Sequence, residues 1–148
     1  MAMVNFSFWQ KWLLVVGVAI TAFGLLMAVS SGTFLFDLFN RQINPAFWGV
    51  NTIDDATRRF QQWIYGAWGA TIAGWGIVLT YIARYPFSKK ERWAWDSLIL
   101  GVLVWFVLDT SLSLFHKVYF NVALNTVLLL LGMLPLVFTR RLFIQRQE

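Results

Sequence analysis

The stretch that decides the fold is VYFNVALNTVLLLLGMLPLVFT, residues 118–139. It contains no charged residue, and it is flanked by Lys117 and Arg140. A bilayer core about 30 Å thick is crossed by roughly 20 helical residues, because each residue of an α-helix rises about 1.5 Å. The 22 residues between Lys117 and Arg140 are therefore enough for one membrane-spanning helix.

Three further stretches have the same character. One of 25 uncharged residues ends before Asp37, and one of 24 ends before Arg84. The fourth, 93–115, is apolar except for Asp96 and Asp109. The sequence therefore predicts an all-α, polytopic membrane protein whose four transmembrane helices form a compact antiparallel bundle. We place the spans of this single domain, residues 1–148, at 10–31, 61–84, 93–115 and 118–139, with an outer aromatic loop at 32–60.

The composition agrees with this prediction. Hydrophobic residues make up 59% of the chain and charged residues only 13%, against about 25% charged residues in an average soluble domain. This excludes a disordered chain and an ordinary soluble enzyme. The chain has no cysteine, so it has no disulfide and no thiolate metal ligand. Its twelve Lys and Arg residues lie almost entirely at the ends of apolar runs, which indicates the lipid bilayer, and no nucleic acid, as a partner.

Basic residues also predict the orientation. Eight of the twelve fall on the side shared by both termini and the loop between the second and third spans, and four fall on the opposite side. Positively charged loops stay in the cytoplasm, so we expect a plasma-membrane protein with both termini cytoplasmic. Ala28-Val29-Ser30 resembles a signal-peptide cleavage site, but the long apolar run with a basic region of only Lys11 favours a span.

Local signals predict how the loops are built. The segment Phe34–Phe39 is expected to lie along the interface as a short amphipathic piece, broken at Asn44-Pro45. Asp54 and Asp55 are residues favoured at a helix start, so the second long helix is expected to begin near residue 54.

On the inner side, Ser88 and Glu91 have the spacing of a capping box, which predicts a helix that begins near Lys89. Asp96 lies one helical turn past Arg92 and can pair with it. Several tryptophans lie near span ends and are expected to anchor at the lipid–water interface, namely Trp9, Trp12, Trp63, Trp93 and Trp95.

Small residues predict how the helices pack, since lipid offers helices no hydrophobic reason to associate and close backbone approach must supply the attraction. The first span carries Gly17 and Gly24 on one face. The second carries Gly66, Ala70 and Gly74 on one face, and Gly69, Ala73 and Gly76 on an adjoining face. We expect the second span to be central. Its partners can belong to the same chain, to a second copy in a homo-oligomer, or to a larger membrane complex.

A polar constellation joins the third and fourth spans. Equal steps away from Lys117 reach equal depth on two antiparallel helices, so eight steps pair Asp109 with Asn125 and four steps pair Ser113 with Asn121. Asp109 should lie roughly 9 Å from the outer end of its helix, inside hydrocarbon. Trp105 shares its face, and Tyr65, Gln61 and Trp68 of the second span could complete a pocket.

An acid at this depth accepts a hydrogen bond, faces a wet cavity or binds a proton. One interpretation is that Asp109 and its neighbours only fasten two helices together. The other is that they orient one polar group of a ligand between apolar walls made by Trp105, Tyr65 and Trp68. In an enzyme, Asp109 could act as a general acid or base.

No motif for known chemistry is present, and the single histidine, His116, cannot make a transition-metal site alone, so we expect no metal and no cofactor. The sequence favours an accessory or self-associating membrane component without catalysis. The alternative is a binder of a lipid or lipophilic small molecule, or a membrane-embedded enzyme, with an outer-leaflet pocket around Asp109. A proton-coupled carrier is a third hypothesis with thinner support, since one acid and one histidine make a poor relay.

Overall fold

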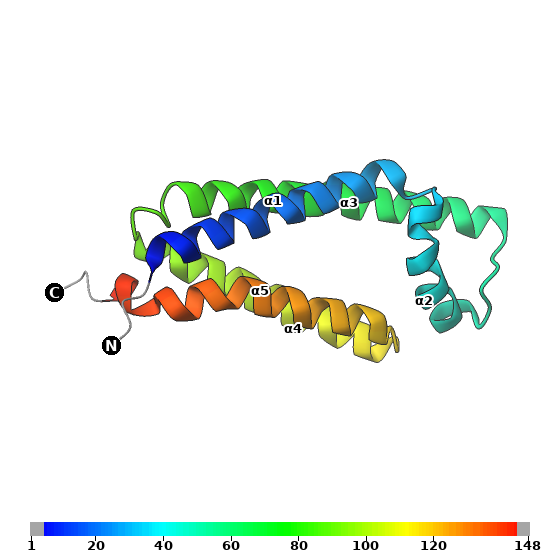
Figure 1. The fold of residues 1–148 in the computed structure, drawn as a ribbon. Helices are drawn as coiled ribbons and strands as arrows, with labels where there is room; N and C mark the ends of the chain where they lie inside the picture. Colours follow the sequence, from blue (N-terminus) through cyan, green and yellow to red (C-terminus); the bar gives the residue numbers. More distant parts are fainter. Residues whose placement is uncertain (1–4, 145–148) are drawn as a thin grey trace.

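The computed structural model describes residues 5–144, and helices make up almost all of this range (Figure 1). Four of the helices are long and apolar enough to cross a membrane, which confirms the predicted all-α class and the four-span count. The elements in chain order are α1 (Phe6–Ser30), the 3-10 helix η1 (Phe34–Phe36), α2 (Asp37–Trp48), α3 (Asp55–Arg84), α4 (Arg92–Phe115) and α5 (Tyr119–Ile144).

The four long helices form two antiparallel hairpins, α1 with α3 and α4 with α5 (Figure 1). The hairpins meet at the end where α1 begins and α5 ends, and they diverge toward the end that carries α2. We call these the inner and the outer end. α1 also contacts α5, whereas α3 meets α4 only briefly. The expectation that the second span is central is therefore wrong, since α1 and α5 each pack on two long helices whereas α3 packs mainly on α1.

Small residues bring α1 and α3 into backbone contact. A Cβ atom on Gly24 would collide with the Ala73 backbone nitrogen, and one on Gly17 would lie 2.5 Å from Thr80 Oγ1. On α3, a Cβ on Gly69 would collide with the backbone nitrogen of Ala28. Only glycine fits at such close approach, so the predicted packing role of Gly17 and Gly24 is confirmed.

Of the two predicted small-residue faces of α3, the one with Gly66, Ala70 and Gly74 does not pack on α1. Gly74 has open space around its Cα, Ala70 is exposed, and a Cβ on Gly66 would make only an ordinary contact of 3.7 Å with Ala28. The adjoining face, with Gly69, Ala73 and Gly76, packs on α1 instead. Two stripes of small residues run side by side on α3, and their composition does not show which one packs on α1. The shape of the facing α1 surface decides this.

Indole hydrogen bonds tie α5 to its neighbours. Pro135 has no backbone N–H, so the carbonyl of Leu131, four residues earlier, lacks its usual helical donor. The indole Nε1 of Trp12 on α1 donates to this carbonyl at 3.0 Å. Trp95 of α4 donates in the same way to the Leu136 carbonyl at 2.8 Å. Trp12 and Trp95 therefore join helices, a role that their position near span ends did not indicate.

Buried hydrophobic side chains gather in two separate clusters. The inner core joins both hairpins and contains Leu13, Ala83, Phe87, Ala94, Leu98, Leu136 and Phe143. The outer core lies beneath α2 and contains Met27, Phe36 and Tyr65. The hairpins are thus held together mainly at the inner end, which agrees with their divergence in Figure 1.

One of the two predicted helix starts is correct. The carboxylate of Asp54 caps α3 by accepting hydrogen bonds from the backbone nitrogens of Ala56 and Thr57, as expected. The capping box before α4 is wrong, because the hydroxyl of Ser88 donates back to the Tyr85 carbonyl at 2.7 Å. Lys90 has a positive φ of 59°, which is incompatible with a helix at this point.

α4 consequently begins at Arg92, with Glu91 before it making no side-chain cap. The predicted pairing of Arg92 with Asp96 is present, with 3.6 Å between Nε and Oδ2. Both side chains are about half exposed, so this pair contributes little stability.

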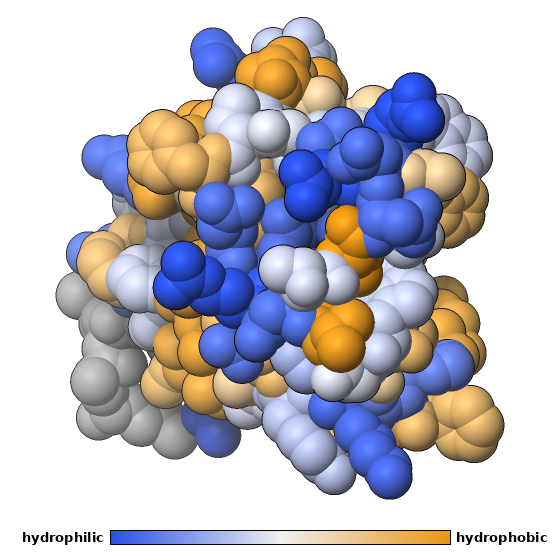
Figure 2. Space-filling view, turned by 90° about the vertical axis from the view of Figure 1, so that its right-hand side faces the viewer, coloured by the Kyte–Doolittle hydropathy of each residue, from blue (hydrophilic) through white to orange (hydrophobic). Residues whose placement is uncertain are grey.

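The outer loop contains a twelve-residue helix, α2. Pro45 does not break it, since the proline lies in its last turn and the helix continues to Trp48. The end comes at Gly49, whose φ of 69° is the left-handed conformation that favours glycine and whose N–H donates to the Pro45 carbonyl at 3.1 Å. Seen from the outer end, hydrophilic residues cover much of the middle of the face, with some hydrophobic residues among them, and both kinds alternate around its rim (Figure 2).

Candidate functional site

The predicted polar constellation between α4 and α5 is present near the outer end. The Asn121 side-chain amide donates to Asp109 Oδ1 and to Ser113 Oγ, both at 2.8 Å. The Ser113 hydroxyl lies 2.7 Å from the Asp109 backbone carbonyl, to which it donates. We call these three residues the Asp109 cluster. The predicted cross-pair of Ser113 with Asn121 is confirmed.

The other predicted cross-pair is not formed. The amide of Asn125 donates to Thr110 Oγ1 at 3.2 Å and not to Asp109. Asn125 is only 2% exposed. Counting from the turn gave the correct depth, but adjacent residues on a helix point about 100° apart, so depth alone does not choose between Asp109 and Thr110.

Tyr65 and Gln61 belong to a separate polar cluster beneath α2. The Gln61 amide donates to Asn44 Oδ1 at 2.8 Å and lies 3.2 Å from the Tyr65 hydroxyl. Asn44 in turn donates to the Asn51 carbonyl at 3.0 Å. Asn44, Gln61 and Tyr65 are all buried, so this cluster fixes α2 to α3. Nothing in the sequence pattern pointed to Asn44, since it was expected to break the helix.

The two tryptophans proposed as apolar walls differ in their surroundings. Trp68 is 57% exposed on α3. Trp105 is partly buried on α4, with its ring centroid 6.5 Å from that of Phe106. Of this pair, only Trp105 shares a helix face with Asp109.

At the outer end, the face of α4 that carries Asp109 packs against α5, where Asn121 reaches both Asp109 and Ser113. Ala94 and Leu98 pack into the inner core with residues of α1 and α3. Trp105 and Asp109 follow at steps of seven and four residues, which keeps all of them on one face of the helix. The hairpins diverge toward the outer end (Figure 1), and the side-chain hydrogen bonds of Asp109 are made within α4 and to α5.

The Asp109 carboxylate is only half satisfied. Oδ1 accepts the Asn121 amide, but no described residue donates to Oδ2, and the side chain is partly exposed. A carboxylate oxygen in hydrocarbon without a donor costs several kcal/mol, or less where water or a ligand reaches it. Oδ2 is therefore an available hydrogen-bond acceptor within a membrane-spanning helix.

A row of aromatic rings crosses from α3 to α5 at the outer end. The ring of Phe36 lies 6.0 Å from that of Tyr65 and 5.4 Å from that of Phe39, which contacts Phe120 at 5.4 Å. Phe47 of α2 also contacts the His116 ring, at 5.2 Å. α2 therefore links the two hairpins where their long helices diverge. The spacing of Phe36, Phe39 and Phe47 could have indicated an inward face.

The chemistry available at this site is limited. Within residues 5–144, no three His, Asp or Glu side chains come together in a way that could hold a metal ion. The Asp109 cluster offers one carboxylate with an amide and a hydroxyl, which suits hydrogen bonding to a polar group more than bond breaking.

These features define a multi-pass, all-helical membrane protein. Comparison with family models, with curated proteins and with solved structures finds no match to this chain.

Proposed function

We propose that the protein binds a lipophilic molecule between its two hairpins, with Asp109 as the acceptor for the polar group of the ligand. The observation that carries this proposal is Asp109 Oδ2, which has no donor among the described residues although it lies within a membrane-spanning helix. Acids within membrane spans are rare and mark binding sites or ion pathways.

The surroundings support a site that is open to lipid. The inner core joins the hairpins at one end, and the aromatic row beneath α2 joins them at the other. Trp105 supplies an apolar surface one turn from Asp109. A ligand with a hydrocarbon body would enter sideways from the bilayer.

The polar group of the ligand should be a hydrogen-bond donor, such as a hydroxyl or an ammonium group. Asp109 Oδ2 can only accept when the carboxylate is ionised.

Native mass spectrometry tests the proposal. Protein extracted gently from its own membrane should carry a small lipophilic adduct, and Asp109→Asn should weaken it roughly tenfold or more, the typical effect of losing a hydrogen bond to a charged group. Asp96→Asn is the matched control on the same helix, because Asp96 pairs with Arg92 at the inner end and should have no effect.

The competing function is the accessory or self-associating component that the sequence favours. If this function is correct, the wild type will carry no small molecule, or only a protein partner, in native mass spectrometry. Asp109→Asn will then leave the spectrum unchanged. A wild type without a small-molecule adduct, or an adduct that Asp109→Asn does not weaken, contradicts the proposal that Asp109 binds a ligand.

We also propose that this is a plasma-membrane protein with both termini in the cytoplasm, on the eight-to-four distribution of basic residues. The absence of cysteine makes labelling simple. A membrane-impermeant maleimide added to intact cells should label Thr52→Cys, beside α2, and should not label Ser88→Cys, between α3 and α4. The reverse pattern would invert the orientation.

A further inference from the structure

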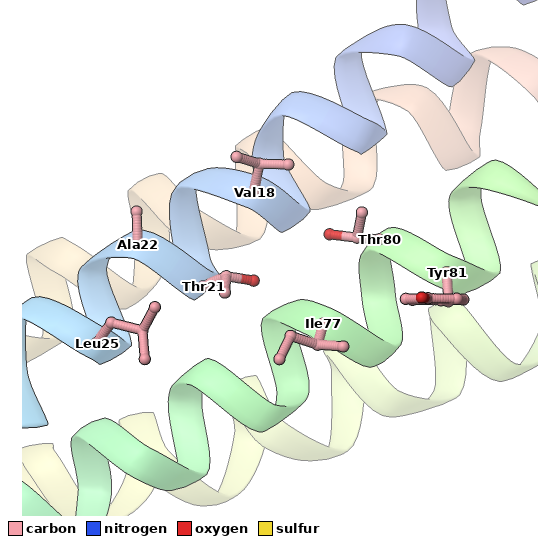
Figure 3. Close-up of a pocket in the computed structure, with 7 residues that line it drawn as sticks. All are labelled: Val18, Thr21, Ala22, Leu25, Ile77, Thr80 and Tyr81. Atoms are coloured by element: carbon pink, nitrogen blue, oxygen red, sulfur yellow. The ribbon is translucent and has the colours of Figure 1, made fainter.

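A shallow apolar groove runs between α1 and α3 on the outside of the first hairpin (Figure 3). Its volume is about 280 Å³, close to the smallest ligand pockets, which begin at about 300 Å³. Val18 and Leu25 line it from α1, and Ile77 and Tyr81 line it from α3. All four side chains are about half exposed or more, so the groove is open to the surrounding lipid.

The lining of the groove has almost no polar surface, although two threonines belong to it. The Thr21 hydroxyl donates to the Gly17 carbonyl at 2.9 Å, and the Thr80 hydroxyl donates to the Gly76 carbonyl at 2.8 Å. Both hydroxyls are satisfied within their own helices. The groove therefore suits hydrocarbon and offers no hydrogen bond to a polar ligand.

Each wall of the groove ends in a basic residue at the inner end. On α1, Lys11, Val18 and Leu25 are spaced by seven residues, which places them on one face. On α3, Arg84 follows Tyr81 by three residues on the groove side. Both basic side chains are exposed.

The packing register of α1 against α3 places Lys11 and Arg84 at nearly the same height along the hairpin axis. Gly17 faces Thr80 and Gly24 faces Ala73, so facing residue numbers sum to 97 in both pairs. Lys11 is then level with residue 86, two residues or roughly 3 Å along the axis from Arg84.

Neither charge is neutralised by an acidic side chain of residues 5–144. The ion pair between Arg92 and Asp96 involves neither of them, and neither makes a salt bridge within the described residues. The Arg84 guanidinium lies 5.7 Å from the centroid of the Tyr85 ring, a cation–π contact that helps to keep it at the helix end.

We propose that this groove binds an anionic phospholipid of the leaflet at the inner end, with one acyl chain between α1 and α3 and the phosphate between Lys11 and Arg84. Charge complementarity favours this occupant. The apolar groove suits a hydrocarbon chain, and the two basic side chains at its inner end suit an anionic headgroup. The site lies on the outer side of the first hairpin, so it does not depend on the proposed ligand of Asp109.

Lipid competition in native mass spectrometry tests the headgroup contact. Purified protein receives equal amounts of phosphatidylglycerol and phosphatidylcholine with identical acyl chains. The wild type should prefer phosphatidylglycerol, and Lys11→Gln/Arg84→Gln should reduce that preference by roughly 30-fold, since each basic residue near a membrane surface contributes about one kilocalorie per mole.

Arg140→Gln/Arg141→Gln is the matched control, because it removes the same charge from the end of α5. It should keep the preference for phosphatidylglycerol. Equal binding of both lipids by the wild type, or an equal loss in this control, overturns the proposal, since the effect would then reflect net charge alone.

A second pair of variants tests the acyl chain. Ala22→Trp fills the groove without altering either charge, and it should weaken phosphatidylglycerol binding at least fivefold. Ala19→Trp is the control, because Ala19 is exposed on α1 and does not line the groove. Binding that is unchanged in Ala22→Trp, or reduced equally in both variants, contradicts occupation of the groove.

Discussion

The two helices of each hairpin are held together by different interactions. In the α1/α3 hairpin, glycines allow backbone to touch backbone, as at Gly24 and Gly69. In the α4/α5 hairpin, no glycine makes so close a contact, and side-chain hydrogen bonds cross between the helices from Trp95, Asn121 and Asn125. The comparison shows two sources of helix association in lipid, where hydrophobic burial contributes little.

The two mechanisms should differ in their tolerance of mutation. Close backbone packing is lost over several turns at once, because one added side chain pushes the two helices apart. A hydrogen bond between transmembrane helices contributes on average about 0.6 kcal/mol and at most about 1.7 kcal/mol. The first hairpin should therefore be sensitive to added volume, and the second should lose stability in small steps.

Gly24→Leu should have the largest effect. The new side chain would collide with the backbone of Ala73 and Gly69, and overpacking of this kind costs about 3 kcal/mol or more. Unfolding by SDS in mixed micelles measures the loss. Gly74→Leu is the matched control on α3, where space is open, and it should change stability by less than about 0.5 kcal/mol.

Asn121→Leu should have the next largest effect. It removes the donor shared by Asp109 and Ser113 and leaves the Asp109 carboxylate with only the longer contact from the Ser113 hydroxyl, 3.3 Å from Oδ1, at a cost of about 1–3 kcal/mol in the same SDS assay. In an Asp109→Ala background the cost should fall below about 1 kcal/mol. A cost that does not change in this background would show that Asn121 acts through packing and not through its hydrogen bonds.

Trp12→Phe should cost about 0.6–1.7 kcal/mol, because it removes the donor to the Leu131 carbonyl while it keeps an aromatic ring. Pro135→Ala sharpens the test, since alanine restores a helical N–H for the same carbonyl. In that background Trp12→Phe should cost less. Equal costs in both backgrounds would contradict the assignment of this hydrogen bond.

The smallest effect concerns the start of α3. Hydrogen bonds from the side chain and backbone of Thr57 lower the pKa of Asp54 from its ordinary value of 3.8. A lowered folded-state pKa means that the cap stabilises the helix above pH 3.8 and is lost as pH falls through the lower, folded-state pKa. Hydrogen exchange at Ala56 and Thr57 should accelerate in that range relative to the intrinsic rate, and Asp54→Asn should abolish this pH dependence. Asp55→Asn should leave it intact.

Predictions from the sequence succeeded where one residue and its near neighbours decide the outcome. Lys117 and Arg140 bound a stretch that can only cross the membrane, and α5 occupies it. Asp54 caps α3 as expected. The Ser88 cap is wrong although it is equally local, because the Ser88 hydroxyl donates to the Tyr85 carbonyl in the turn and does not accept from a backbone N–H of α4.

The Asp109 cluster was partly predictable. Counting from the turn gave the depth of Asn121 and Asn125 correctly, because antiparallel helices joined by a short turn rise at the same rate. Which side chain meets which depends on how each helix is rotated about its axis. That rotation is set by packing, so Asn125 reached Thr110, and Tyr65 joined Asn44 beneath α2.

The sequence by itself determined the helical class, the four spans and the small and polar residues available for packing, because these depend on hydropathy and on chain length measured against the bilayer. Only the tertiary structure decided that the α3 stripe with Gly69 meets α1 while the stripe with Ala70 does not, and that α2 bridges hairpins which diverge. Those outcomes depend on the complementary shapes of surfaces far apart in the chain, which no local pattern contains.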